Sequence, residues 1–178
     1  ARMDGRDWRD LILLSLLGNL IYYVGLAVAV QSAGVALASL VIGLLPVTIT
    51  LVGAKPGEGT PVRRLLAPLA LIVAGGVCIN VDAFAAAGRA GAGRTLVGLG
   101  GALLALAVWT AYAVWNARRL AATPKFNSHE WSLLTGVATG LLSLLIVVPA
   151  FALGGKAHAA SAWGLFWGVS FAVAIGAS

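Results

Sequence analysis

Six long stretches of the chain contain no Asp, Glu, Lys or Arg, and they constrain the fold more than any other feature of the sequence. Most are close to the roughly 20 apolar residues that a helix needs to cross the ~30 Å hydrocarbon core of a membrane. Charged residues make up only 10% of the chain, against about 25% in soluble domains. We therefore expect an all-α integral membrane protein, a bundle of about six transmembrane helices at residues 11–30, 33–54, 65–81, 95–117, 131–153 and 162–178.

The basic residues lie between these apolar stretches and indicate an orientation. Nine of the twelve Lys and Arg residues precede the first stretch, or lie between the second and third, or between the fourth and fifth. The positive-inside rule places these nine in the cytoplasm. Since the basic residues form no continuous face, we expect the lipid bilayer as the partner and no nucleic acid, despite the net charge of +6.

Turn-forming residues suggest how the chain is divided. Residues 31–34 form a tight hairpin between the first two stretches, and residues 82–94 are rich in Ala and Gly. We expect three transmembrane helices in residues 1–82, which end a first half-repeat, then an external linker at 83–94, and three more helices in 95–178, which begin a second half-repeat. Because Ala1 is not an initiator Met, we expect an internal part of a longer protein, or the ordered part of one.

The sequence offers little catalytic chemistry. His129 and His158 fall in connections on opposite sides of the predicted membrane, so they cannot share a metal ion. We expect no buried carboxylate pair, no nucleophile beside a base, no metal and no cofactor. An enzyme is therefore not expected.

Polar and aromatic residues inside two of the apolar stretches are the candidate functional residues. Helical spacing puts each set on one face, and an Asn in hydrocarbon needs a hydrogen-bond partner. Two interpretations stay open, because such residues can line a cavity or can hold helices together. The first set is Ser15, Asn19, Tyr22 and Tyr23, and the second is Trp109, Tyr112 and Asn116.

Pro46 lies in the middle of the second stretch. Proline lacks the N–H that a helix interior requires, so it frees a carbonyl near residue 42 and bends the helix. Bends of this kind often line cavities, and we include Pro46 among the candidate site residues.

The order of these features resembles the EamA family of the drug/metabolite transporter superfamily. The resemblance lies in Tyr22-Tyr23, the segment Gln31-Ser32-Ala33-Gly34, the mid-span Pro46, the run Ala74-Gly75-Gly76-Val77, and Gly98 to Ala107 followed by Trp109, Tyr112 and Arg118-Arg119. It covers nearly all of the chain, as helices three to eight of the family's ten.

This resemblance implies two five-helix halves of inverted topology around a central substrate cavity. It implies export of amino acids and other small metabolites, a small-molecule solute as partner, and a bacterial inner-membrane location. It also adds Trp167 and Ser170 in the last stretch to the candidate lining residues.

Two functions are therefore compared. The first is a secondary transporter or exporter of small organic metabolites. Its predicted spans contain no ionisable residue that could relay protons. The second is a non-transporting membrane scaffold whose polar residues serve only helix packing. A transporter should leave a water-accessible cavity between the polar stripes, and a scaffold should fill that space with neighbouring side chains.

The orientation can be tested by labelling single cysteines with a membrane-impermeant thiol reagent, in a background without Cys78. We expect Gly57→Cys and Thr123→Cys to react only from the cytoplasmic side and Gly88→Cys only from outside, because of the charge distribution. Labelling of position 57 from outside would contradict the orientation.

Overall fold

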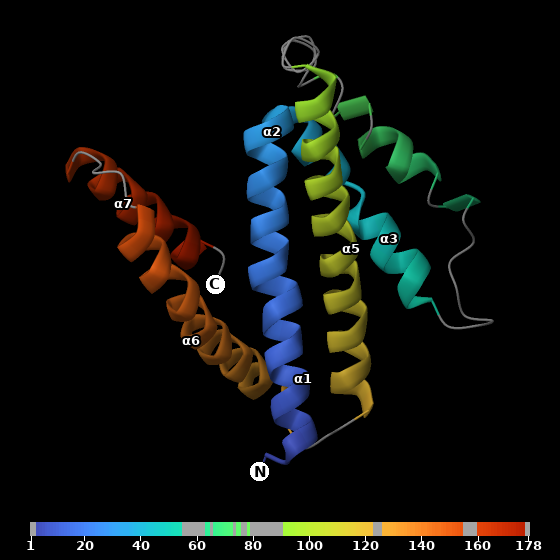
Figure 1. Ribbon diagram of the computed structural model, residues 1–178. Helices are drawn as coiled ribbons and strands as arrows, with labels where there is room; N and C mark the ends of the chain where they lie inside the picture. The colour runs from blue at the N-terminus through green and yellow to red at the C-terminus, as the bar shows by residue number, and fades with distance from the viewer. Residues whose placement is uncertain are drawn as a thin grey trace. The chain divides into compact units, whose positions relative to one another are not determined.

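The computed structural model describes residues 3–54, 63–64, 66–72, 74–75, 78, 91–122, 126–154 and 160–176, with side chains for all of these except 146, 148–154 and 173–176. Every element in this part of the chain is helical, which confirms the all-α prediction there (Figure 1). The chain forms two compact units, Ala1–Ser143 and Leu144–Ser178. The elements are α1 (Gly5–Ser15), the π-helix η1 (Leu16–Ile21), α2 (Tyr22–Ile42), α3 (Leu45–Gly53), α5 (Ala92–Ala122), α6 (Ser128–Gly154) and α7 (Ala160–Gly176).

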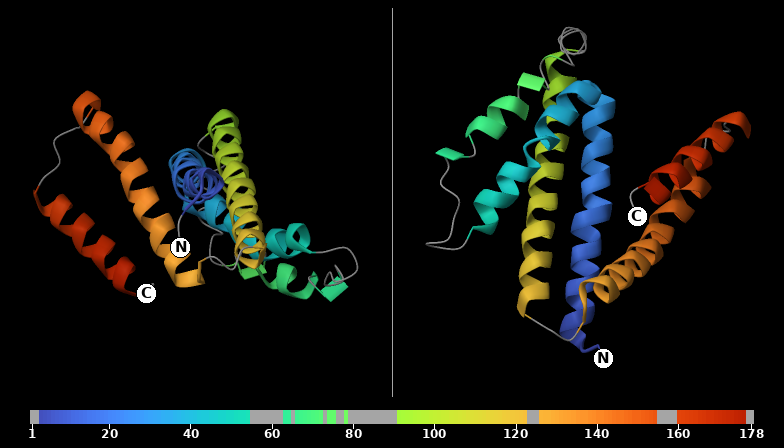
Figure 2. Two further views of the ribbon diagram at one scale, coloured as in Figure 1. Left: turned by 90° about the horizontal axis from the view of Figure 1, so that it is seen from below. Right: turned by 180° about the vertical axis from the view of Figure 1, so that it is seen from behind.

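Gly34 ends the first long helical segment. Its φ of 86° and ψ of 166° leave the helical region inside α2, so the chain changes direction there. Glycine adopts a positive φ without the Cβ clash that other residues meet. The remainder of α2 and then α3 run back beside α5 (Figures 1 and 2). The predicted tight hairpin at residues 31–34 is thus confirmed.

A second break separates α2 from α3 at Gly43 and Leu44. Pro46 occupies the first turn of α3. A backbone N–H at this position makes no hydrogen bond within the helix, so proline costs none there. The predicted effect of Pro46 on the helix is confirmed, and it takes the form of a new helix start rather than a smooth bend.

Small residues let α5 lie very close to α2 (Figure 2). A Cβ added to Gly101 would lie 2.7 Å from the carbonyl oxygen of Gly25, and one added to Gly98 would overlap Ala33. The buried residues of this contact are Ala29, Ala38, Val41, Ala102 and Leu106. In a membrane, where lipid removes most of the hydrophobic gain between helices, such close backbone contact is a main source of association.

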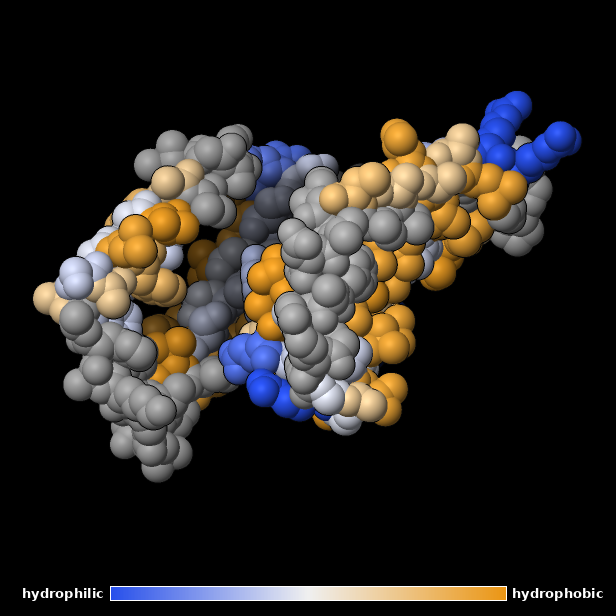
Figure 3. All heavy atoms as spheres, turned by 90° about the horizontal axis from the view of Figure 1, so that it is seen from above, coloured by the Kyte–Doolittle hydropathy of each residue, from blue (hydrophilic) through white to orange (hydrophobic). Residues whose placement is uncertain are grey.

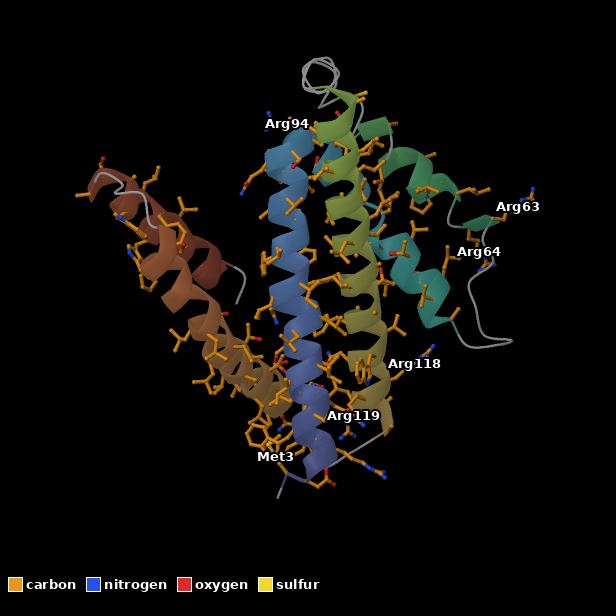
Figure 4. All side chains as sticks on the ribbon, viewed as in Figure 1. Met3, Arg63, Arg64, Arg94, Arg118 and Arg119 are labelled. Atoms are coloured by element: carbon orange, nitrogen blue, oxygen red, sulfur yellow. The ribbon has the colours of Figure 1, made fainter. Side chains whose placement is uncertain are left out.

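Basic side chains at the two ends of α5 bind carbonyl groups of neighbouring segments (Figure 4). Arg94 donates to the Gln31 carbonyl oxygen at 3.4 Å, and Arg118 donates to that of Val52 at 3.3 Å. The first carbonyl lies just before the break at Gly34 and the second near the end of α3, where helical carbonyls lack helical partners. Arg94 and Arg118 therefore help to terminate these helices.

Two helical segments of the described chain, Gly5–Ile42 and Ala92–Ala122, are long and apolar enough to cross a membrane. Many of their large apolar side chains are exposed, including Val24, Val35, Leu96, Leu103 and Leu104. Figure 3 shows apolar surface over much of the described residues in view.

Most of the predicted linker at 83–94 lies outside the described residues, and α5 begins at Ala92, so the division into half-repeats stays a prediction.

The close contact of α5 with α2 can be tested with two neighbouring glycines. We expect Gly101→Ala to lower the free energy of unfolding by about 1–3 kcal/mol, the usual cost of overpacking, because the new methyl group would meet the Gly25 carbonyl. Gly100→Ala is the control, since its Cβ would meet none of the described residues within 4 Å, and alanine should raise helix stability by roughly 0.5–1 kcal/mol. Thermal unfolding in detergent measures both, and equal effects would contradict the packing.

Candidate functional site

A polar cavity of about 270 Å³ lies between three segments of the unit Ala1–Ser143. This volume is just below the roughly 300–1,000 Å³ of typical ligand pockets. The segment η1 supplies one lining residue, α5 supplies two, and the first turns of α6 supply the rest. The lining residues are Asn19, Tyr112, Asn116, Trp131, Ser132, Thr135, Gly136 and Thr139.

Asn19 enters the cavity from the π-helical turn η1. A π-helix forms i→i+5 hydrogen bonds, and such turns are frequent at functional sites. The Asn19 side-chain nitrogen donates to the Thr139 hydroxyl at 3.0 Å. One turn earlier, the buried Ser15 hydroxyl donates to the Thr135 carbonyl oxygen at 3.4 Å. Ser15 and Asn19 of the first polar set therefore join this segment to α6.

Asn116 forms the matching contact from α5. Its side-chain oxygen accepts a hydrogen bond from the indole nitrogen of Trp131 at 2.8 Å, and both residues line the cavity. The two interpretations of the polar stripes are therefore compatible for Asn19 and Asn116. Each bonds a neighbouring helix with one part of its side chain and still contributes to the cavity wall.

Tyr112 fits into the cavity wall because Gly18 has no side chain. A Cβ on Gly18 would lie 2.5 Å from the Tyr112 ring. Behind Tyr112 the rings continue in a row, with centroids 5.3 Å apart for Tyr112 and Trp109 and 4.6 Å apart for Trp109 and Tyr22. Both distances lie in the range of favourable aromatic pairs. Trp109 and Tyr22 therefore support the Tyr112 ring from outside the cavity lining.

The remaining predicted site residues lie elsewhere in the described chain. Tyr23 is 60% exposed, since its side chain points away from the face that carries Asn19. Pro46 is exposed on α3. Trp167 and Ser170 belong to α7, in the unit Leu144–Ser178, where Trp167 contacts the rings of Phe166 and Phe171.

Gly136 and Gly140 form a small-residue pair of the kind that often marks a helix contact. Among the described residues, a Cβ at either position would meet nothing within 4 Å. At Gly136 this space is part of the polar cavity, so the absence of a side chain there enlarges the cavity.

Three charged residues beside the cavity form a buried group, which we call the ion cluster: Asp7, Asp10 and Arg119. Arg119 donates to the Asp7 carboxylate, and its Nε lies 2.9 Å from an Asp10 carboxylate oxygen. Asp7 and Asp10 are only 1% and 7% exposed. Figure 4 shows Arg119 at the end of α5 that lies beside the start of α1.

The ion cluster also organises the ends of the helices. Asp7 and Asp4 form a reciprocal capping box at the start of α1, in which each side chain accepts a hydrogen bond from the other's backbone N–H. A carboxylate in the first helical turn is favoured by the helix dipole. The guanidinium of Arg119 lies 5.9 Å from the centre of the Trp131 ring, within cation–π range. The ion cluster thus contacts the cavity through Trp131.

The sequence prediction that the chain has no buried carboxylate pair is wrong for Asp7 and Asp10. It treated the charged residues before the first apolar stretch as solvated. A signal was present, because Asp4, Asp7 and Asp10 recur every third residue between arginines, and residues three apart share one side of a helix. Arg119 could not be matched to them from sequence, because more than a hundred residues separate the partners.

The cavity can bind a small polar solute without covalent chemistry. It offers amide and hydroxyl groups for hydrogen bonds, and the Tyr112 and Trp131 rings for stacking. Among the described residues, no group of three or more His, Cys, Asp or Glu is placed to hold a metal ion.

The chain is similar to one curated protein, "Inner membrane protein YtfF" of Escherichia coli (strain K12). The two are 30% identical over 149 residues, which are 79% of this chain and 45% of that protein. The chain therefore spans about half the length of this relative. No family model and no solved structure matches the chain. The relative and the two membrane-capable helices place the chain in the inner membrane.

The hydrogen bond between Asn19 and Thr139 can be measured by a double-mutant cycle. We expect Asn19→Ala and Thr139→Val to be coupled by about 0.5–2 kcal/mol in the free energy of unfolding, as for other interhelical hydrogen bonds in membranes. Thr50→Val is the control partner, because its hydroxyl bonds the Pro46 carbonyl of its own helix. It should add to Asn19→Ala without coupling, and similar coupling for both pairs would contradict the assignment.

Proposed function

We propose that the chain is part of a secondary transporter or exporter of small organic metabolites, such as amino acids, across the inner membrane. The observation that supports this most directly is the polar cavity, which remains open between η1, α5 and α6 although its walls are hydrogen-bonded to one another. A solute that entered it would meet both polar groups and aromatic rings.

The cavity favours transport over a non-transporting scaffold. In a scaffold, the polar stripes would be covered by neighbouring side chains. Here Asn19, Tyr112 and Asn116 each take part in a contact between helices and still border open space. The hydrogen bonds hold the walls in a fixed position, which lowers the entropy cost of binding a solute.

The proposed whole protein is larger than this chain. The relative is about twice as long as the matched region, which agrees with a ten-helix EamA transporter of which this chain would supply helices three to eight. In that arrangement the six proposed transmembrane helices belong to two inverted half-repeats. Trp167 and Ser170 stay candidate lining residues from the resemblance alone, and further lining residues would come from the helices outside this chain.

The role of the aromatic row can be tested in the full-length protein in vesicles, with a panel of radiolabelled amino acids. We expect Tyr112→Ala to reduce the transport rate per molecule by about two- to tenfold, because an aromatic contact is worth about 0.5–1.5 kcal/mol. Membrane abundance should stay normal, since span hydrophobicity sets insertion. Asn116→Ala should reduce transport as well, and Trp109→Ala should have a smaller effect, because it acts through Tyr112.

Leu104→Ala is the matched control, since Leu104 lies on the same helix with its side chain exposed. It should leave transport unchanged. Low abundance with normal transport per molecule in the Tyr112 and Trp109 variants would favour a packing role instead. Normal transport and abundance in all three variants would remove this face of α5 from the site.

A further inference from the structure

We propose that the ion cluster of Asp7, Asp10 and Arg119 is a gate that closes one end of the polar cavity by holding the Trp131 ring in place. This inference rests on the proposed transport function, because only a transporter needs to open its cavity to one side at a time. Asp7, Asp10 and Arg119 lie outside the predicted transmembrane stretches and outside the cavity lining, whereas Trp131 lines the cavity.

The first argument is the position of Trp131. Its side chain is 3% exposed and borders two spaces. One is the polar cavity, and the other is a void of about 10 Å³ lined by Arg119, Leu120 and Phe126. The indole therefore separates the cavity from the surroundings of Arg119.

The second argument is how Trp131 is held. The indole nitrogen donates to Asn116 on the cavity side, and Arg119 lies over the ring on the other side. Asn116 and Arg119 are three residues apart on α5, so they share one side of that helix. Any movement of Arg119 away from the ring would remove the contact that covers this face of the indole and leave its hydrogen bond to Asn116 and its apolar packing.

The third argument is that moving Arg119 away from α1 would be energetically costly. Two carboxylates of α1 bind it, in an environment where all three charges are largely removed from water. A buried ion pair contributes little net stability, because desolvation offsets the attraction, yet separating its partners is costly. Such a contact specifies one arrangement of helices and resists intermediate ones, which is the property a gate requires.

The fourth argument is that the ion cluster joins the segments that would have to separate. Asp7 and Asp10 lie on α1, Arg119 on α5 and Trp131 at the start of α6. Opening the cavity at this end requires α1 to move from α5 or α6. The ion cluster opposes the first movement directly, and the ring of Trp131, packed on Leu11 and Leu14, opposes the second.

The gate can be tested without knowing the solute. The full-length protein would carry Thr135→Cys as a reporter, because Thr135 lines the cavity and is only 7% exposed, and Cys78 would be replaced. The measurement is the rate of labelling by a membrane-impermeant thiol reagent, in vesicles of each orientation. We expect Arg119→Gln to increase labelling from the side of the α1 start by about fivefold or more, as the population shifts toward the open state, with no increase from the other side.

Two further variants keep the test decisive. The triple variant Asp7→Asn, Asp10→Asn and Arg119→Gln removes the ion cluster without leaving a charge buried and unpaired, and it should show the same one-sided increase. Arg118→Gln is the control, because Arg118 lies next in sequence but is exposed and donates to the Val52 carbonyl oxygen instead of the ion cluster. It should label at the wild-type rate.

Three results would overturn the gate. The first is an unchanged labelling rate in the triple variant at normal abundance. The second is an equal increase from both sides, which would mean that the ion cluster holds the fold as a whole. The third is failure of both the single and the triple variant to accumulate in the membrane. None of these depends on solute transport, so a failure of the proposed function, seen as no transport by the wild-type protein, is a separate result.

Discussion

The close approach of α5 to α2 sets the spacing of the candidate-site residues that η1 and α5 carry. Gly98 and Gly101 bring the two backbones together, and this contact fixes the distance between the helix that carries Asn19 and the helix that carries Tyr112 and Asn116. Gly18 permits a similar close contact beside the cavity, because the Tyr112 ring occupies the space that a side chain at position 18 would take. A larger residue at any of these glycines would push the helices apart. The polar groups of the site would then move away from one another, although none of them had been changed.

Most of the secondary structure could be predicted from the sequence, because in hydrocarbon a span must satisfy its own backbone hydrogen bonds and so is helical. The turn at Gly34 and the break before Pro46 also followed from residue type, since glycine and proline change the backbone locally. Helical periodicity placed Asn19, Tyr112 and Asn116 on inward faces. It did not predict the π-helical turn η1, after which Tyr23 is exposed.

The ion cluster shows the limit of reading charges by their place in the sequence. Charges at the ends of apolar stretches are normally solvated and report orientation. Arg118 and Arg119 are adjacent, yet only Arg119 is turned toward α1, where it meets Asp7 and Asp10. Which of two neighbouring arginines is buried depends on the rotation of α5 about its axis.

The same residues can hold helices together and line a path for a solute, because the two roles use different parts of a side chain. Asn116 accepts a hydrogen bond from Trp131 through its oxygen, and Asn19 donates to Thr139 through its nitrogen. Each amide therefore keeps its other polar atom for a second partner. A solute that binds those atoms need not break the contacts between helices. A solute that competes with the Trp131 indole for Asn116 would instead free the ring that Arg119 covers, and so would link occupancy of the cavity to the state of the ion cluster.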